Sequence, residues 1–395
     1  MRLLLDAFLD LLQICLRGLP WPTEPRLIRV GNPGRDAPVL LTCNYSFTVR
    51  GVMRALRGQD AYLLVASTKG INVWCAAAGG YFTAHQVISI LRTTGIGDRV
   101  NHRRLILPQL SATGVERKLV KERTGWHIVF GPVYARDLPA YLRAGRKTKE
   151  MRQVSFPFVS RLEMAVAWAF PISAIGCAIF VVGWRHLALP FAGMVWGVSV
   201  GLFALFPWLF KRVWPEMKNE PGWMRYLILF DPSIRRNFVV WLVFVAGLGV
   251  FDRVRGAWVP WHFVGWSLAS FLLVLLISMD MPGNTPIYKS GLHEDCRLHI
   301  DLDSEACKGR AMCWEVCPKN CYIIDTSIHK AGIALPDACV QCGACVVQCP
   351  EDALAFVNPT GQRIPPETIR RYKLNMVGRR AIAVSSDSHE QRREA

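Results

Sequence analysis

Hydrophobic residues along the chain fall into two patterns that predict different kinds of structure. Between Pro38 and about Gly145, short apolar runs alternate with segments whose apolar residues recur at helical spacing. These predict strands over Pro38–Cys43, Ala61–Ala66, Leu105–Leu107 and Trp126–Phe130, and helices over Thr83–Thr93 and Gly114–Arg123. Such alternation is typical of a Rossmann-like α/β domain with a mostly parallel sheet, whose ligand lies beyond the carboxyl ends of the strands.

The second pattern is a series of long apolar segments. Met164–Trp184 and Leu187–Phe210 are long enough to cross about 30 Å of hydrocarbon at about 1.5 Å per residue. Ala257–Ile277 is a third such segment. Phe238–Phe251 is uninterrupted for only 14 residues, so a re-entrant or interfacial segment is the alternative there. Counting it as a span, the sequence predicts a helical transmembrane region of four spans.

Charge placement predicts which side of the membrane each loop faces. The chain has 47 Lys and Arg against 30 Asp and Glu, a net charge of +17. Basic residues concentrate before the first span and between the second and third: Arg143, Arg146, Lys147, Lys149, Arg152 and Arg161, then Lys211, Arg212, Lys218, Arg225, Arg235 and Arg236. The other side has only Arg185, and then Arg253 with Arg255. Because cytoplasmic loops are enriched in Lys and Arg, both soluble ends are predicted to face the cytoplasm of a prokaryotic cell, and the basic charge is assigned to the membrane surface rather than to nucleic acid.

The remaining segments complete the predicted organisation. Met1–Arg17 is leucine-rich, but polar residues recur in it at helical spacing, so we expect an amphipathic helix that lies on the bilayer or caps the head, with simple core packing as the alternative. The expected segments are an amphipathic N-terminal segment (1–30), the α/β head (31–160), transmembrane helices (161–280), a linker (281–300), a cysteine-rich α+β domain (301–360) and a polar tail (361–395) that is disordered after about Ile382.

Eight of the 13 cysteines lie between Cys307 and Cys349. The run Cys339-x2-Cys342-x2-Cys345-x3-Cys349-Pro350 has the spacing of a bacterial-type ferredoxin, in which three thiolates hold one cube and the fourth reaches the other. The earlier run, Cys307-x5-Cys313-x3-Cys317-Pro318, has Arg310 where that pattern places a further Cys. By this crossed rule, one [4Fe–4S] cluster is held by Cys317, Cys339, Cys342 and Cys345.

The second cluster site is short of one ligand. The thiols left for it are Cys307, Cys313 and Cys349. The site is therefore predicted to hold a [3Fe–4S] cluster, or a four-iron cluster completed by Cys321 or Cys296, because the guanidinium of Arg310 has no acceptor atom. Structural zinc is the alternative for clustered Cys, but two Cys-rich halves that each end in Cys-Pro favour a dicluster ferredoxin domain in a reducing compartment.

A separate thiol, Cys75, lies in the head within a short segment of small residues. Asn72 is suited to be a helix N-cap whose side chain accepts from the backbone N–H of Cys75, and the helix dipole then favours thiolate over thiol. The residues that follow, Ala76, Ala77, Ala78, Gly79 and Gly80, leave a surface that a planar tetrapyrrole can approach. Trp74 is expected to wall this pocket, and an ordinary buried Cys is the alternative.

Three runs in the head resemble a known family. Gly70–Ala77, Asn101–Leu110 and Gly131–Ala135 look like the corrinoid-binding domain of the mercury-methylation protein HgcA. More distantly, they are similar to the corrinoid subunit of the CO dehydrogenase/acetyl-CoA synthase complex. The resemblance covers about Gly31 to Phe156, and the spans followed by a ferredoxin resemble HgcA fused to its partner HgcB.

This resemblance implies a cofactor and an activity. Cys75 would be the lower axial ligand to the cobalt of a cobalamin whose own base is displaced. The implied cofactor-binding residues are Asn72, Val73, Trp74, Cys75, Ala76 and Ala77. A methyl-folate or methyl-corrinoid protein would donate the methyl group, Hg(II) would accept it, and the ferredoxin, supplied by an upstream electron donor, would reduce the cobalt. Two departures leave the acceptor open: Ala78-Gly79 stands where the family has Gly-Lys, and no Cys follows Cys349.

Two alternatives come from other classes of protein. One is a redox or reactivation protein that reduces or stores a corrinoid for a separate methyltransferase, and the other is a membrane ferredoxin whose head binds no corrinoid. Imidazole is the other common lower ligand of corrinoid methyltransferases, but their Asp-x-His-x-x-Gly signature does not occur here, so His85 is expected on a helix surface or at a pocket edge. Cys43 and Cys177 are expected to be structural.

Overall fold

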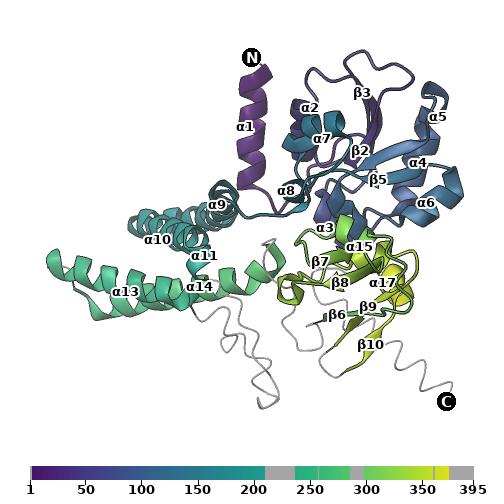
Figure 1. The fold of residues 1–395 in the computed structure, drawn as a ribbon. Coiled ribbons are helices and arrows are strands. Elements are labelled where there is room, and N and C mark those ends of the chain that lie inside the picture. The colour runs from purple at the N-terminus through teal and green to yellow at the C-terminus, as the bar shows by residue number, and fades with distance from the viewer. Residues whose placement is uncertain (1, 210–235, 257, 285–297, 359–360, 373–395) are drawn as a thin grey trace, which may run out of the picture. The chain divides into compact units, whose positions relative to one another are not determined.

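The computed structural model describes residues 2–209, 236–256, 258–284, 298–358 and 361–372 (Figure 1). They form two compact units, residues 1–19 with 155–288 and residues 20–154 with 289–395. The second unit contains both the α/β head and the cysteine-rich domain. Cys296, the basic residues from Lys211 to Arg235, most of the predicted linker and the tail beyond Tyr372 lie outside the described residues.

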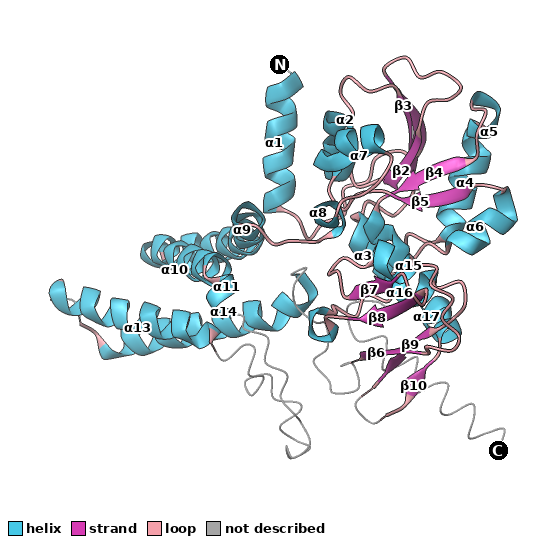
Figure 2. Cartoon of the chain, viewed as in Figure 1, coloured by secondary structure: helices cyan, strands magenta, loops and turns pink. Residues whose placement is uncertain are grey.

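A five-stranded sheet organises the head (Figure 2). Its strands are β1 (Arg26–Val30), β2 (Val39–Cys43), β3 (Ala61–Ala66), β4 (Arg104–Leu107) and β5 (His127–Phe130). Their order is β1-β3-β2-β4-β5, with β1 antiparallel to β3 and the other pairs parallel. The four parallel strands match the predicted runs within one residue at each end, and the mixed α/β head is confirmed.

Both faces of the sheet are buried, because alternate side chains of each strand pack against helices on opposite sides. Leu41 and Leu64 belong to one core, and Leu40 and Leu63 to the other. The first core is covered by α3 (Val73–Ala78), α4 (Ala84–Thr94) and α6 (Arg117–Thr124), and the second by α2 (Ser46–Ala55) and α7 (Leu138–Ala144). The head also contains α5 (Ile96–Arg99), α8 (Lys149–Arg152) and the 3-10 helices η1 (Gln109–Thr113) and η2 (Ala135–Asp137).

Two features of the head differ from the sequence prediction. The strand β1 lies in the segment assigned to the amphipathic N-terminus, but it pairs with β3 along its whole length and closes that edge of the sheet. The helix predicted from Gly114 begins instead at Arg117, because η1 occupies the preceding residues and ends at Gly114.

The cysteine-rich domain is a small α+β fold. Its elements are β6 (His299–Leu302), α15 (Met312–Val316), β7 (Tyr322–Asp325), β8 (Lys330–Ile333), η7 (Pro336–Ala338), α16 (Ala344–Gln348), β9 (Leu354–Val357), β10 (Arg363–Ile364) and α17 (Pro366–Tyr372). One antiparallel sheet has the order β10-β9-β6, and β7 pairs with β8. Both β10 and α17 fall in residues assigned to the polar tail, and they belong to the fold because Ile364 and Ile369 bury their side chains in its core.

The other unit is helical. Its described helices are α1 (Arg2–Cys15), α9 (Phe158–Gly183), α10 (Arg185–Ala204), α11 (Phe206–Leu209), α13 (Asn237–Val254) and α14 (Pro260–Asn284). Within the described residues, α9, α10, α13 and the Pro260–Ser278 part of α14 are long and apolar enough to cross a membrane. Each predicted span therefore corresponds to a helix, including Phe238–Phe251, which lies inside the 18 residues of α13.

The N-terminal helix α1 packs against α9, and Arg17 Nη1 lies 3.4 Å from Glu163 Oε2. The apolar residues Leu4, Phe8 and Leu11 on α1 are exposed, whereas Gln13 is buried. The helix is therefore amphipathic as predicted, with one side against α9, and its location at a bilayer surface stays a prediction.

Candidate functional site

Cys75 lies in the short helix α3, which begins as the sequence predicts. Asn72 is the N-cap, and its Oδ1 accepts a hydrogen bond from the backbone N–H of Cys75 at 2.9 Å. The Cys75 side chain is exposed, so the alternative of an ordinary buried cysteine does not hold. A thiol at this place is accessible to a ligand that approaches the surface of the head.

The small residues of α3 have a different role from the one predicted. Val73, Ala76 and Ala77 are 9%, 0% and 0% exposed, because they pack into the head core. Ala76 and Ala77 therefore do not form an open surface beneath a ligand. Of the predicted cofactor-binding residues, Asn72, Trp74 and Cys75 are the ones that reach solvent.

The backbone at Gly114 approaches the inner side of α3 so closely that small residues are needed there. A Cβ atom at Gly114 would lie 2.6 Å from Ala77 O, 2.9 Å from Ala77 Cα and 2.4 Å from Phe82 O. These are backbone approaches that side-chain rotation cannot relieve, so the turn after η1 and the helix α3 are in direct backbone contact. The position of Cys75 is thus fixed by close packing against η1.

Asn44 holds the turn that precedes α3, and the sequence analysis did not identify it. This residue follows β2 and is 3% exposed. Its Oδ1 accepts from Thr68 N at 2.8 Å, Thr68 Oγ1 at 3.0 Å and Gly70 N at 2.9 Å, while Nδ2 donates to Thr23 O at 2.8 Å. The sequence does carry a signal for Asn44, because a polar residue directly after a buried strand is expected to be hydrogen-bonded.

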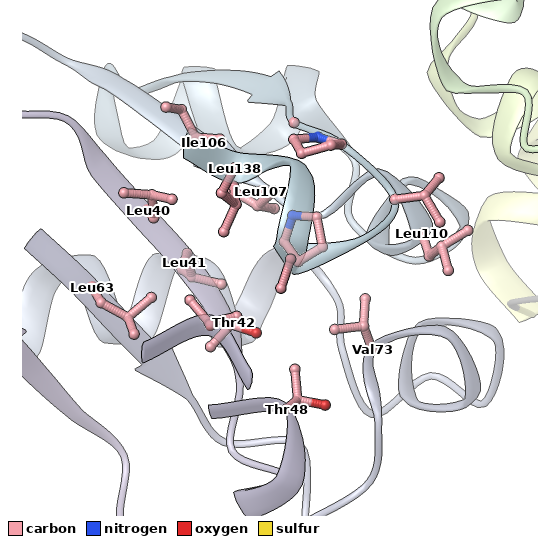
Figure 3. A pocket seen from close by; sticks show the side chains of 16 residues that line it. Leu40, Leu41, Thr42, Thr48, Leu63, Val73, Ile106, Leu107, Leu110 and Leu138 are labelled. Carbon is pink, nitrogen blue, oxygen red and sulfur yellow. The ribbon is translucent and has the colours of Figure 1, made fainter. Parts of the chain in front are cut away.

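A cavity of about 90 Å³ lies beside α3, at the carboxyl ends of the parallel strands (Figure 3). From β2 the chain adds β3 on one side of the sheet and then β4 on the other, so the strand order reverses between β2 and β4, and ligands of open α/β sheets bind at such a point. The lining includes Val73, Leu110 and Gly131, one from each of the three runs that carry the family resemblance. It is mostly apolar, with the hydroxyls of Thr42 and Thr48 as polar groups, and the buried Thr42 Oγ1 has no hydrogen-bond partner in the described part of the chain.

Five cysteines gather around a second cavity, of about 20 Å³, in the cysteine-rich domain. They are Cys317, Cys321, Cys339, Cys342 and Cys345. Backbone amides point at two of the sulfurs, with Cys321 N donating to Cys317 Sγ and Gln341 N to Cys339 Sγ, each at 3.3 Å. Amide donors stabilise thiolate charge, so this arrangement suits sulfur ligands of a cluster.

The other three cysteines of the array form a separate group. Burial is the main cause that raises the pKa of Cys313 to about 12, and the charges of Cys349 and Cys307 raise it further. The crossed assignment of these cysteines to two clusters stays a prediction from their spacing. Cys321 lies with the first group, where the hydrogen bond to Cys317 is the main cause that raises its pKa. It is thus not placed to complete the second group, as one interpretation of the sequence required.

The head and the cysteine-rich domain meet at η1. Gln348 of α16 donates from Nε2 to Ala112 O and to Val115 O, both at 2.7 Å. Gln348 is 3% exposed, and its neighbour Ala344 belongs to the same hydrophobic core as α3. The helix that carries Cys345 and the helix that carries Cys75 therefore pack on the same short 3-10 segment.

The other candidate residues lie outside these sites. His85 is exposed in the first turn of α4, a surface position as expected. Cys43 is fully buried in the core, and burial raises the pKa of its thiol. Cys177 Sγ lies 3.3 Å from Ala188 O, between α9 and α10.

The head and the cysteine-rich domain each contain a segment that matches the model of a known family. Residues 18–142 match the family of the CO dehydrogenase/acetyl-CoA synthase delta subunit, and residues 335–355 match the 4Fe-4S binding domain. The head is homologous to corrinoid/iron–sulfur subunits. It is 35% identical over 133 residues to the acetyl-CoA decarbonylase/synthase complex subunit gamma of Archaeoglobus fulgidus, covering 33% of this chain and 28% of that protein.

Two further relatives agree with this assignment. The gamma subunit of Methanopyrus kandleri is 36% identical over 125 residues, covering 31% of this chain and 27% of that protein. The corrinoid/iron-sulfur protein large subunit of Moorella thermoacetica is 29% identical over 128 residues, covering 32% and 28%. The chain thus spans less than a third of the length of these curated relatives, and the likeness concerns the head alone.

Replacing Asn44 by Ala should destabilise the head, because the backbone N–H groups of Thr68 and Gly70 lose their buried acceptor. We expect the unfolding free energy to fall by about 2–4 kcal/mol, measured by denaturant titration with tryptophan fluorescence. The matched control is Asn101→Ala, since Asn101 donates to Asp36 Oδ1 at an exposed position and should change stability by less than about 0.5 kcal/mol. Equal stability of the two variants would contradict the role assigned to Asn44.

Proposed function

We propose that this protein is a membrane-anchored corrinoid and iron–sulfur protein that acts in methyl transfer. The observation that carries the proposal is an exposed thiol, Cys75, on a helix that borders an apolar cavity in a head homologous to corrinoid/iron–sulfur subunits. The 4Fe-4S binding domain in the same chain supports the iron–sulfur part of this proposal. The coarse function follows from this combination, and the residue roles below extend it.

Cys75 is the lower axial ligand to cobalt in this proposal. Its thiolate is accessible, and the Asn72 cap fixes the backbone at the same residue. Asn72 and Trp74 border the corrin, whereas Val73 contributes to the neighbouring cavity. We assign that cavity to the displaced base of the cofactor, because it is apolar, lies at the carboxyl ends of the strands and offers the unpaired Thr42 hydroxyl.

Cobalamin, when bound, supplies a cobalt that carries and releases a methyl group. The protein would contribute the sulfur of Cys75, which would hold the cobalt as a strong donor. The packing of α3 on η1 keeps this sulfur in place. Residues of the head would therefore orient the cofactor.

The ferredoxin domain would supply the electrons that reduce a bound corrinoid. Cys317, Cys339, Cys342 and Cys345 are proposed to hold a [4Fe–4S] cluster, and Cys307, Cys313 and Cys349 a second cluster with three thiolate ligands. An upstream electron donor reduces this domain. The shared contact with η1 supports direct transfer to the head, since α16 and α3 pack on the same residues.

The methyl donor and acceptor come from the family resemblance. A methyl-folate or a methyl-corrinoid protein is the proposed donor, and Hg(II) is the proposed soft acceptor. A corrinoid reduction or reactivation protein is the second candidate, and the observation that favours it is Ala78-Gly79 in place of the Gly-Lys of the mercury-methylation family. Supplying Hg(II) and a methyl donor to the loaded protein separates the two, because reactivation forms no methylmercury.

The membrane anchor is proposed to comprise α9, α10, α13 and α14, with the head and the ferredoxin domain in the cytoplasm of a prokaryotic cell. An even number of crossings returns the chain to the side from which it started. The head and the ferredoxin domain belong to one compact unit, so both must lie on the same side of the membrane. That requirement supports four crossings over three.

Replacing Cys75 by Ala should abolish the thiolate–cobalt absorption bands and leave the iron–sulfur absorbance intact. The measurement is the optical spectrum of anaerobically purified protein loaded with hydroxocobalamin. Cys177→Ala is the control, because that thiol packs between α9 and α10. An unchanged corrin spectrum in the Cys75 variant would rule out the ligand assignment, and a wild-type protein that retains no cobalamin would contradict the proposed function.

Replacing Arg310 by Cys should complete the second cluster, because the new thiol stands at the position where a bacterial-type ferredoxin has its ligand. We expect the EPR signal of an oxidised three-iron cluster to disappear and the iron content to rise by about one atom per chain. Arg310→Ala is the control and should keep the three-iron signal. A three-iron signal that persists in the Cys variant would refute the proposed ligand position.

Reporter fusions test the orientation of the anchor. Alkaline phosphatase fused after Arg255, between α13 and α14, should be active because that loop is predicted to lie outside the cytoplasm. The same enzyme fused after Leu209, beyond α10, should be inactive. Activity measured in whole cells with the reverse pattern would defeat the proposed orientation.

A further inference from the structure

Side chains of the head donate hydrogen bonds to the turn that carries Cys317. Three of these contacts go to successive carbonyl oxygens at the end of α15: Arg152 Nη1 donates to Trp314 O at 2.7 Å, Lys147 Nζ to Glu315 O at 3.1 Å, and Gln109 Nε2 to Val316 O at 3.3 Å. The next residue is Cys317, which is the C-cap of α15. The head therefore supplies the polar groups that the end of this helix needs.

These contacts satisfy a requirement that α15 cannot meet alone. The last carbonyl groups of a helix have no partner within the helix, and cations are favourable at that end. Two further hydrogen bonds join the head to the residues after Cys317. Val154 N donates to Pro318 O and Lys319 Nζ donates to Val154 O, both at 2.9 Å. The backbone on both sides of Cys317 is thus held by residues that belong to the head.

Arg152 brings a permanent positive charge to this place. The residue is 3% exposed, and its guanidinium lies 3.4 Å from the centre of the Trp314 ring. Burial lowers its pKa, while the charge of the Cys317 thiolate acts in the opposite direction and favours the protonated form. An arginine stays protonated in proteins, so the charge remains beside Cys317 at any working pH.

Lys147 acts mainly through its hydrogen bonds, because its positive charge, unlike that of Arg152, depends on pH near neutrality. Burial is the main cause that lowers its pKa to about 8, and Glu315 partly offsets that effect. Its Nζ also donates to Gln109 Oε1 at 3.0 Å, and Gln109 Nε2 in turn donates to Arg152 O at 2.9 Å. Lys147 and Gln109 therefore keep Arg152 in position.

We propose that Arg152 is a positioning residue of the head that sets the reduction potential of the cluster held by Cys317. The proposal rests on the proposed function, because it requires that Cys317, Cys339, Cys342 and Cys345 bind a [4Fe–4S] cluster. One-electron reduction adds a negative charge to the cluster and its ligands, and a buried cation nearby stabilises that charge more than it would in water. The contact with the head thereby raises the potential of this cluster.

The test is an EPR-monitored redox titration of the full-length protein in detergent, with dithionite as the source of the electron. In Arg152→Gln we expect the midpoint potential of the [4Fe–4S] signal to shift to more negative values, because the cation is removed and an amide remains to donate to Trp314 O. Arg152→Lys should keep most of the wild-type potential. Lys149→Gln is the matched control, since it removes an exposed positive charge from the same short helix, α8, and should leave the potential unchanged.

Each outcome decides the proposal. A full complement of cluster iron in Arg152→Gln with an unchanged potential would overturn it, and so would equal shifts in Arg152→Gln and Lys149→Gln. Should Arg152→Gln lose the cluster, Arg152→Lys decides: a retained cluster near the wild-type potential supports the role of the charge, and a lost or shifted one refutes it. A wild-type protein without iron and sulfide would refute the proposed function instead.

Discussion

Close packing of η1 is the constraint on which both candidate sites depend. This five-residue helix contacts α3 on one side and α16 on another, and its polar residues Gln109, Ser111 and Thr113 are buried. Buried polar groups are costly unless they are hydrogen-bonded, and here they bind carbonyl groups of both domains and of η1 itself. The segment therefore cannot shift without breaking several buried bonds. The thiol of Cys75 and the helix of Cys345 share one fixed support.

Packing of the ferredoxin domain on η1 gives the fusion a second advantage, a fixed orientation, besides a high effective concentration. A flexible tether raises the effective concentration of a domain and leaves its orientation free. Here Gln348 is buried against Ala112 and Val115, and Ala344 lies in the core of the head, so the orientation is set by packing. A fixed orientation removes the search for a productive encounter at each electron transfer.

Local signals explain what the sequence predicted correctly. The run Ala61–Ala66 is a continuous apolar segment and forms β3 over the same residues, and Asn72 is a cap because its side chain needs only a backbone amide three residues away. By contrast, Gln109 and Gln348 look like surface residues in sequence, and their partners lie more than 200 positions away in the case of Gln348. Long-range burial of a polar side chain leaves no pattern in a single sequence.

The fate of the basic residues before the first apolar helix shows the same limit. Six of them support the predicted orientation, but a count of charges assumes that each one is available to the membrane surface. Lys147 and Arg152 are instead used at the end of α15, and Arg161 Nη1 donates to Ala204 O at 2.6 Å. Arg143, Arg146 and Lys149 are exposed. Three exposed cations before the first span still outnumber the single Arg185 after it, so the predicted orientation rests on a smaller difference in charge. The other three cations donate to backbone carbonyl groups instead.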